Sequence, residues 1–156
     1  MRLVLYQPDI PQNTGTMVRL AACLGAAVDI VEPAGFDVSD RNFRRAGMDY
    51  LDRVEIVRHR SWSAFEEWRR EVGVRLVLAT TRGATRYTDF AFAAGDAILV
   101  GRESAGVPEA VHEAADARVV IPMRPGFRSL NVAVSAAMLL GEAARQTGWA
   151  GVAPEG

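Results

Sequence analysis

Three segments of the chain place polar side chains directly after a short apolar run. Asn13 and Arg19 follow the first run, Glu103 follows the second, and Ser129 and Asn131 follow the third. Amide, hydroxyl, carboxylate and guanidinium groups can hold a ligand and align it for reaction, although several of these residue types are also common at helix ends. Their recurrence at three such points favours one shared site over three unrelated helix caps.

The first segment, QPDIPQNTGTMVR, predicts a strand that ends near two prolines and a helix that begins at Asn13 or Thr14. Asn13 is a good N-cap residue, and capping alone explains it as well as a role in a site does. Arg19 is harder to explain structurally. It lies nearly two turns into an otherwise apolar helix, where an arginine should be paired or directed at an anionic partner.

The second segment, ILVGRESAGVP, predicts a strand that ends at Gly101 and a helix that starts at Pro108. A glycine at this position lets a ligand approach the backbone, at the edge where α/β sheets bind ligands, but a turn needs glycines too. Glu103 is not required by the turn, although a carboxylate near a helix start is commonly a cap. No GxGxxG follows the first strand and no GxxxxGK[ST] occurs, which removes the main support for dinucleotide- and triphosphate-binding folds.

The third segment, IPMRPGFRSLNVAVSAAMLLGEAARQ, predicts a long helix that opens near Leu130 or Asn131. Arg128, Ser129 and Asn131 stand together at this opening, where an N-cap is again the alternative to a binding role. The helix itself is apolar and rich in alanine. Its small residues would allow close backbone packing: Ala133, Ala136, Ala137 and Gly141.

These segments need a frame of strands and helices to bring them together. Ser61 or Ser63 can cap a helix that ends at Gly73, and Trp62 and Trp68 on that helix are expected in the core, with base stacking as the less common alternative. Helices alternate with almost wholly apolar strands, which is typical of a parallel sheet covered on both faces. The predicted fold class is α/β, with strands at Arg2–Tyr6, Ala27–Val31, Val54–Val57, Val74–Ala79, Ala97–Val100 and Arg118–Ile121.

Length and composition indicate an ordinary globular protein. The 156 residues, 49% of them apolar and with a net charge of −1, fit one domain over residues 1–150 with a frayed tail at 151–156. No apolar run approaches the roughly 20 residues of a membrane helix and no signal peptide is evident, so a cytoplasmic protein is expected. Cys23 is expected in the core, and the isolated His59 and His112 predict no metal site.

Basic side chains are concentrated in one part of the chain. All 18 basic residues are arginines, and six of them lie between Arg41 and Arg60 against three acids. Arginine grips phosphate with two hydrogen bonds and stacks on bases. A solvated face is the commoner explanation of such a cluster, and nucleic-acid binding is the alternative.

The order and spacing of the three segments resemble the three motifs of the SPOUT methyltransferases of the TrmH-like branch, over essentially the whole chain. Asn13 and Arg19 match the first motif, residues 101–108 match Gly-x-Glu-[Ser/Thr]-x-Gly-[Leu/Val]-Pro, and residues 128–131 match Arg-Ser-[Leu/Met]-Asn. The stretches LYQPDIPQNTG, IVEPAGF, RRAGMDY and GEAARQTG are similar to those of branch members that methylate the wobble cytidine or uridine of tRNA.

The resemblance implies a fold and a reaction. The fold would be an α/β domain with a parallel sheet and a C-terminal deep trefoil knot, in an obligate homodimer. The reaction would be metal-free methylation of the wobble ribose 2'-hydroxyl by S-adenosylmethionine, which becomes S-adenosylhomocysteine. The donor would bind at Ala79, Thr80, Gly101, Ile121, Ser129 and Leu130. The tRNA anticodon stem-loop would contact Arg41, Arg44, Arg45, Arg58 and Arg60.

The resemblance also implies a catalytic group, made of Arg19, Asn13, Glu103 and Asn131. Arg19 would act as an unusual general base or would orient the ribose hydroxyl, and a guanidinium pKa above about 12 favours orientation. Two departures from the family pattern, at Arg102 and at Ala133-Val134, favour one alternative, a non-catalytic module that binds RNA or a nucleotide. Two others stay open: a ribosomal RNA methyltransferase, and a Rossmann-type oxidoreductase, which the missing glycine fingerprint disfavours.

Overall fold

The computed structural model describes residues 1–37, 40–83, 85–149 and 152. Within these residues the chain forms a seven-stranded sheet in the order β3-β2-β1-β6-β4-β7-β5, and every pairing is parallel. The carboxyl ends of the strands therefore meet at one edge. The strands are β1 (Arg2–Tyr6), β2 (Ala27–Val31), β3 (Ile56–His59), β4 (Leu76–Ala79), β5 (Thr85–Arg86), β6 (Ala97–Val100) and β7 (Ala117–Val120).

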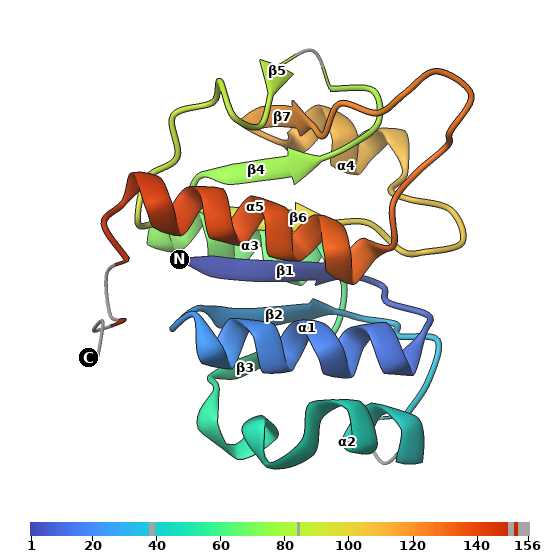
Figure 1. Ribbon diagram of the computed structural model, residues 1–156. Coiled ribbons are helices and arrows are strands. Elements are labelled where there is room, and N and C mark those ends of the chain that lie inside the picture. Colours follow the sequence, from blue (N-terminus) through green and yellow to red (C-terminus); the bar gives the residue numbers. More distant parts are fainter. Residues whose placement is uncertain (38–39, 84, 150–151, 153–156) are drawn as a thin grey trace.

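Helices cover both faces of the sheet (Figure 1). One face carries α1 (Pro11–Cys23) and α5 (Val132–Gln146), and the other carries α3 (Trp62–Val72) and α4 (Glu109–Ala114). A short helix α2 (Arg41–Gly47) and the 3₁₀ helix η1 (Met48–Arg53) pack beside α1. The predicted α/β class is confirmed.

Strand β1 separates two hydrophobic cores. Leu3 and Leu5 point into the core beneath α1 and α5, whereas Val4 and Tyr6 point into the core that contains Phe65 of α3. Side chains that alternate between two covered faces make a strand apolar throughout, which is why these strands were visible in the sequence. Each of the six predicted strands is present within two residues of its expected ends, whereas β5, two exposed residues long, was missed.

Both ends of α3 agree with the sequence prediction, whereas the start of α1 differs from it. Ser61 caps α3, because its hydroxyl accepts a hydrogen bond from the Ala64 amide at 3.1 Å, and Gly73 ends it with φ of +71°. The predicted start of α1 is wrong: the helix begins at Pro11, with Ile10 as the N-cap. Proline lacks only an amide that a first helical position does not use, so it starts the helix earlier and frees Asn13 from capping.

The expected burial of Cys23 is also wrong, since this cysteine is exposed at the last residue of α1. The buried side of α1 includes Met17, Val18 and Ala21, and helical periodicity turns Cys23 away from it. Trp62 and Trp68 pack against the core beneath α3, as expected. Of the predicted tail at 151–156, only Val152 lies inside the described residues.

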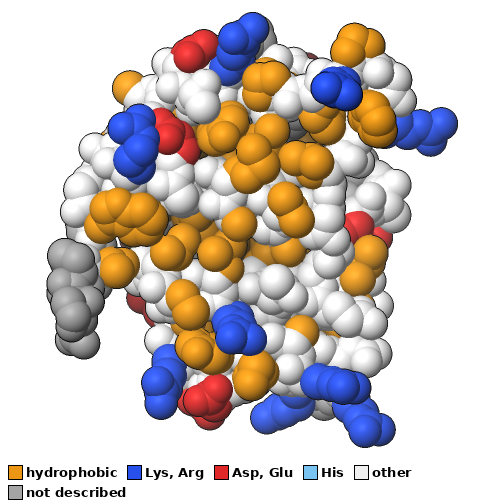
Figure 2. All heavy atoms as spheres, viewed as in Figure 1, with side chains coloured by type: hydrophobic (Ala, Val, Ile, Leu, Met, Phe, Trp, Pro, Cys, Tyr) orange, Lys and Arg blue, Asp and Glu red, His pale blue; other side chains and the backbone are white. Residues whose placement is uncertain are grey.

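Apolar side chains also gather on the outer surface of the face that carries α1 and α5 (Figure 2). Val134 of α5 is 49% exposed, Ala137 is exposed beside it, and Met48 of η1 is 53% exposed. Ala133 and Ala136, by contrast, pack on the sheet. The helices of the described residues include none that is long and apolar enough to span a membrane.

Candidate active site

The three loops that carry the predicted polar residues meet at the carboxyl edge of the sheet. A cavity of about 630 Å³ lies there, walled by the ends of β4, β6 and β7 and by the start of α5. This volume lies within the range of pockets that bind small ligands and cofactors. All the residues predicted to hold the methyl donor line the cavity, namely Ala79, Thr80, Gly101, Ile121, Ser129 and Leu130.

Two glycines close the turn that follows β6. Arg102 and Gly106 pair as an antiparallel bridge with backbone hydrogen bonds of 2.8 and 3.1 Å. A Cβ atom on Gly101 would lie 2.7 Å from the carbonyl carbon of Gly106, whose own φ is +64°. Both glycines are therefore required by the turn itself, and the closed turn directs Glu103 toward α1.

One chain of hydrogen bonds joins the three loops. Asn131 Nδ2 donates to Asn13 Oδ1 at 3.2 Å, and Asn13 Nδ2 donates to Glu103 Oε1 at 3.4 Å. Asn131 is also the N-cap of α5, since its Oδ1 accepts from the Ala133 amide at 2.8 Å. All three side chains line the cavity. The structure thus brings these predicted residues together, and their catalytic role stays a prediction.

Asp9 belongs to the same site and was missed by the sequence reasoning. Its carboxylate accepts from the Glu103 amide at 3.1 Å and from the Ser104 hydroxyl, and its own amide donates to Glu103 Oε2 at 3.1 Å. Its position could have indicated a role in the site, because Asp9 comes three residues after the end of β1, at the edge where parallel sheets bind ligands.

The carboxyl groups of Asp9 and Glu103 titrate as a pair. Hydrogen bonding with Glu103 lowers the pKa of Asp9 to about 2. Burial, followed by the hydrogen bond with Asp9, raises the pKa of Glu103 above its ordinary value. As the pH falls, Glu103 therefore takes up a proton first, while Asp9 keeps its negative charge.

Arg102, one of the two departures from the family pattern, lies against the loop after β1. Its Nε atom is 3.6 Å from Asp9 Oδ2, and a terminal nitrogen donates to Gln7 Oε1 at 3.5 Å. The side chain is 33% exposed. It therefore neutralises part of the charge of Asp9 and does not simply extend into solvent.

Arg19 lies apart from the hydrogen-bonded residues. Its exposed side chain donates to the sulfur of Met48 at 3.2 Å and lies 5.0 Å from the centre of the Tyr50 ring. The described residues that line the cavity do not include it. The expectation that Asn13, Glu103 and Asn131 hold Arg19 is not met within one chain. Arg19 lies six residues after Asn13 on α1, which places it about 9 Å further along the helix axis.

The arginines predicted to bind RNA are exposed. None of them is among the described residues that line the cavity. Three of them project from α2, and the other two lie at the end of β3, where Arg58 pairs with Glu32. The five are Arg41, Arg44, Arg45, Arg58 and Arg60. Among the described residues, no three His, Cys, Asp or Glu side chains cluster as metal ligands would.

Comparison with known proteins identifies the family. Residues 1–141 match the SpoU rRNA Methylase family. The chain belongs to this family. Among its SpoU relatives, it is similar to a tRNA (cytidine(34)-2'-O)-methyltransferase from Ancylobacter novellus, 68% identical over 95% of this chain and 94% of the relative. A protein of the same name from Polaromonas sp. is 42% identical over 96% of this chain and 92% of the relative.

Solved SpoU structures have the same fold. A structure described as giving insights into the 2-OH methylation of C/U34 on tRNA aligns with a TM-score of 0.89 at 41% identity, covering 93% of this chain and 94% of that chain. The SpoU methyltransferase AviRb from Streptomyces viridochromogenes, in complex with the cofactor AdoMet, aligns with a TM-score of 0.86 at 32% identity, covering 94% of this chain and 57% of that chain.

Proposed function

We propose that this protein transfers a methyl group from S-adenosylmethionine to the ribose 2'-hydroxyl of nucleotide 34, a cytidine or uridine, in tRNA. The supporting observation is a cavity lined by Asn131, Asn13 and Glu103, which hydrogen bonds link to one another, in a chain 68% identical to a tRNA (cytidine(34)-2'-O)-methyltransferase. A tRNA substrate is consistent with the expected cytoplasmic location.

The cavity suits the proposed donor. Val100, Ile121 and Leu130 offer apolar walls for the adenine ring and the methionine chain, and the hydroxyls of Thr80 and Ser129 offer hydrogen-bonding groups. A SpoU neighbour binds AdoMet on the same fold. When bound, the donor supplies a methyl group on a positively charged sulfur, an electrophile that needs no metal. The C-terminal trefoil knot belongs to the proposal too, and the membership of the chain in the SpoU family supports it.

The residues of the chain have to align the ribose oxygen and let its proton leave. The oxygen bonds to the methyl carbon as the carbon–sulfur bond breaks, the electron pair stays on sulfur, and the hydroxyl proton passes to a base or to solvent. Asn131, Asn13 and Glu103 are linked at the cavity wall, and in this proposal they position the ribose. Asp9 fixes Glu103 through two backbone hydrogen bonds.

A second copy of the chain would complete the site. The exposed apolar surface around Val134, Ala137 and Met48 lies on the face that carries α1 and α5, and Arg19 contacts Met48 there. Covering this surface with the same surface of a partner would bury apolar area. We include in the proposal that Arg19 of one copy reaches the cavity of the other and orients the ribose hydroxyl. The exposed arginines of α2 and β3 would then hold the anticodon stem-loop.

Methylation of ribosomal RNA is the second candidate, because the family's description names rRNA. Transfer of labelled methyl groups to tRNA lacking the wobble modification, and in parallel to unmodified rRNA, distinguishes the two. We expect label in tRNA alone. Label in rRNA alone would establish the second candidate, and no label in either RNA despite donor binding would contradict an RNA methyltransferase.

The same assay tests Arg19. We expect Arg19→Ala to lower kcat by roughly 100-fold, the scale of losing one group that stabilises the transition state, without weakening donor binding. Arg70→Ala is the matched control, because this exposed arginine lies on α3, on the opposite face of the sheet. Wild-type activity in Arg19→Ala would remove Arg19 from the mechanism.

A further inference from the structure

The loop between β7 and α5 carries an exposed aromatic ring beside the cavity. Phe127 is 72% exposed, the highest value among the large hydrophobic side chains of the described residues. Its amide donates to the Arg124 carbonyl at 3.4 Å, and Gly126 between them has φ of +91°, so the ring is presented on a tight turn. One exposed apolar residue is ordinary on a protein surface, and its surroundings decide what it can bind.

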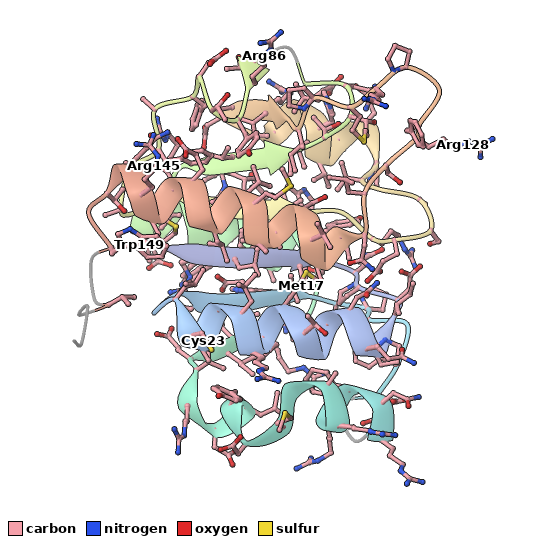
Figure 3. All side chains as sticks on the ribbon, in the orientation of Figure 1. Met17, Cys23, Arg86, Arg128, Arg145 and Trp149 are labelled. Atoms are coloured by element: carbon pink, nitrogen blue, oxygen red, sulfur yellow. The ribbon has the colours of Figure 1, made fainter. Side chains whose placement is uncertain are left out.

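Two arginines flank the ring. Arg124 and Arg128 are exposed, and neither side chain forms a hydrogen bond or ion pair with any residue in the part of the chain that the structure describes. Residues 122–131 contain no acid. Arg128 points away from the body of the protein at the carboxyl edge of the sheet (Figure 3). An exposed aromatic ring on a loop that also carries two unpaired guanidinium groups suits a partner that has flat faces and negative charges.

The position of the loop connects this surface to the reaction site. Arg128 and Asn131 line the cavity, whereas Phe127 lies beside the described residues that do so. Asn131 is four positions after Phe127 in the chain, which limits the distance between their Cα atoms to about 14 Å. A group bound to the ring therefore lies near the proposed ribose site and outside the space proposed for the donor.

We propose that Phe127 stacks on an unpaired base next to the methylated nucleotide, with Arg124 and Arg128 on the adjoining phosphates. This inference rests on the proposed function, which makes single-stranded RNA the substrate. Proteins recognise unpaired RNA by stacking bases on aromatic rings and by gripping the backbone with arginine. A second copy of the chain fits this loop less well, because the centres of protein interfaces exclude uncompensated charge.

The stacking is testable with an anticodon stem-loop that carries the fluorescent base 2-aminopurine on one or the other side of nucleotide 34. We expect wild type to quench the fluorescence at one of these positions. Phe127→Leu should lose that quenching and weaken RNA binding by about 10-fold, because stacking on an aromatic ring contributes about 1–3 kcal/mol per base. Phe127→Tyr is the matched control, and it should keep both properties since it keeps the ring.

The two arginines are tested by the salt dependence of RNA binding. Arg124→Gln and Arg128→Gln should each reduce the slope of log Kd against log salt by about 0.7, the contribution of one phosphate contact to a single strand. Arg70→Gln, on the opposite face of the sheet, should leave the slope unchanged. Unchanged slopes in both loop variants would overturn the phosphate contacts.

Two further measurements separate this inference from its alternatives. Donor affinity and sedimentation of Phe127→Leu should match wild type, and a change in oligomeric state would assign the ring to a protein interface and overturn the proposal. If wild type methylates nucleotide 34 while Phe127→Leu binds and quenches as wild type does, only the stacking fails. If no methylation occurs but the variants still differ in binding and quenching, the proposed function fails and the stacking stands.

Discussion

At Glu103, neighbouring groups set the charge state of a single carboxyl. It accepts hydrogen bonds from the Asp9 amide and the Asn13 side chain, and it lies beside the Asp9 carboxylate. Burial and the contact with Asp9 raise its pKa above the ordinary value of 4.5. If the site needs Glu103 as a carboxylate acceptor, activity should be lost as the pH falls through this raised pKa, earlier than an ordinary glutamate would protonate.

Glu103→Gln tests this role. The amide keeps one oxygen acceptor but cannot titrate, so we expect kcat to fall by about 10- to 100-fold, the acidic limb of the pH–rate profile to disappear, and donor affinity to stay within about twofold. Glu109→Gln is the control, since Glu109 pairs with Arg82 outside the cavity. An acidic limb that persists in Glu103→Gln would show that another group controls it.

The sequence predicted the positions of some residues of the candidate site and not of others. Asn13, Glu103 and Asn131 each follow a strand, and a parallel sheet brings such positions to one edge, so their meeting was predictable. Asp9 was not recognised, because it lies between Pro8 and Pro11 and an aspartate is an ordinary residue in such a turn. The contact of Arg19 with Met48 was not predictable. The apolar pattern of a helix does not show which element packs against each of its sides.

The turn after β6 is the element on which the proposed donor site depends most. Residues 101–106 double back so closely that the backbone of Gly101 touches that of Gly106. The same turn carries Glu103 and forms part of the cavity wall. Opening it would displace Glu103 and part of the proposed donor site together.

Gly101→Ala should open this turn. Its Cβ would lie 2.7 Å from a backbone carbon, which cannot move aside as a flexible side chain can. We expect donor Kd to rise by at least about 10-fold and Tm to fall by several degrees, the usual effect of 1–2 kcal/mol in a domain of this size. Gly95→Ala, whose Cβ would meet nothing within 4 Å, should change neither quantity by as much. Equal donor affinity in both variants would contradict the assignment of this turn.

The secondary structure elements were predictable where a long pattern supported them. Six strands were evident because most of their side chains are apolar, and the central ones, β1, β4 and β6, contribute to the cores on both faces of the sheet. Strand β5 has two exposed residues and no such pattern. The predicted start of α1 is too late because Asn13 has the residue type of an N-cap, whereas Pro11 suits the first helical position and begins the helix earlier.

At the scale of the whole molecule, the face of the sheet that carries α1 and α5 has an outer surface with many apolar side chains. Apolar side chains gather outside α1 and α5 (Figure 2), and the proposed dimer would cover them. Val134 on that face is 49% exposed and Val72 at the end of α3, on the other face, is 51% exposed. These two valines are similarly exposed but lie on opposite faces of the sheet, so they form a matched pair for substitution.

Substituting each valine with arginine tests the dimer. Val134→Arg should sediment as a monomer, because it places an unpaired charge in an apolar interface, and it should keep donor binding but lose methyl transfer if Arg19 acts across the interface. Val72→Arg should remain a dimer with activity near that of wild type. A Val134→Arg protein that stays dimeric would place the interface elsewhere.

The ribose at nucleotide 34 provides the most direct test of the proposed reaction. Wild-type protein and S-adenosylmethionine are incubated with two tRNAs that are identical except for a 2'-deoxyribose at nucleotide 34, and nuclease digests are analysed by mass spectrometry. We predict a 2'-O-methylated nucleoside from nucleotide 34 of the ordinary tRNA and no methylation of the deoxy tRNA. Equal methylation of both tRNAs, or a methyl group on a base or on another nucleotide, would contradict the proposed function.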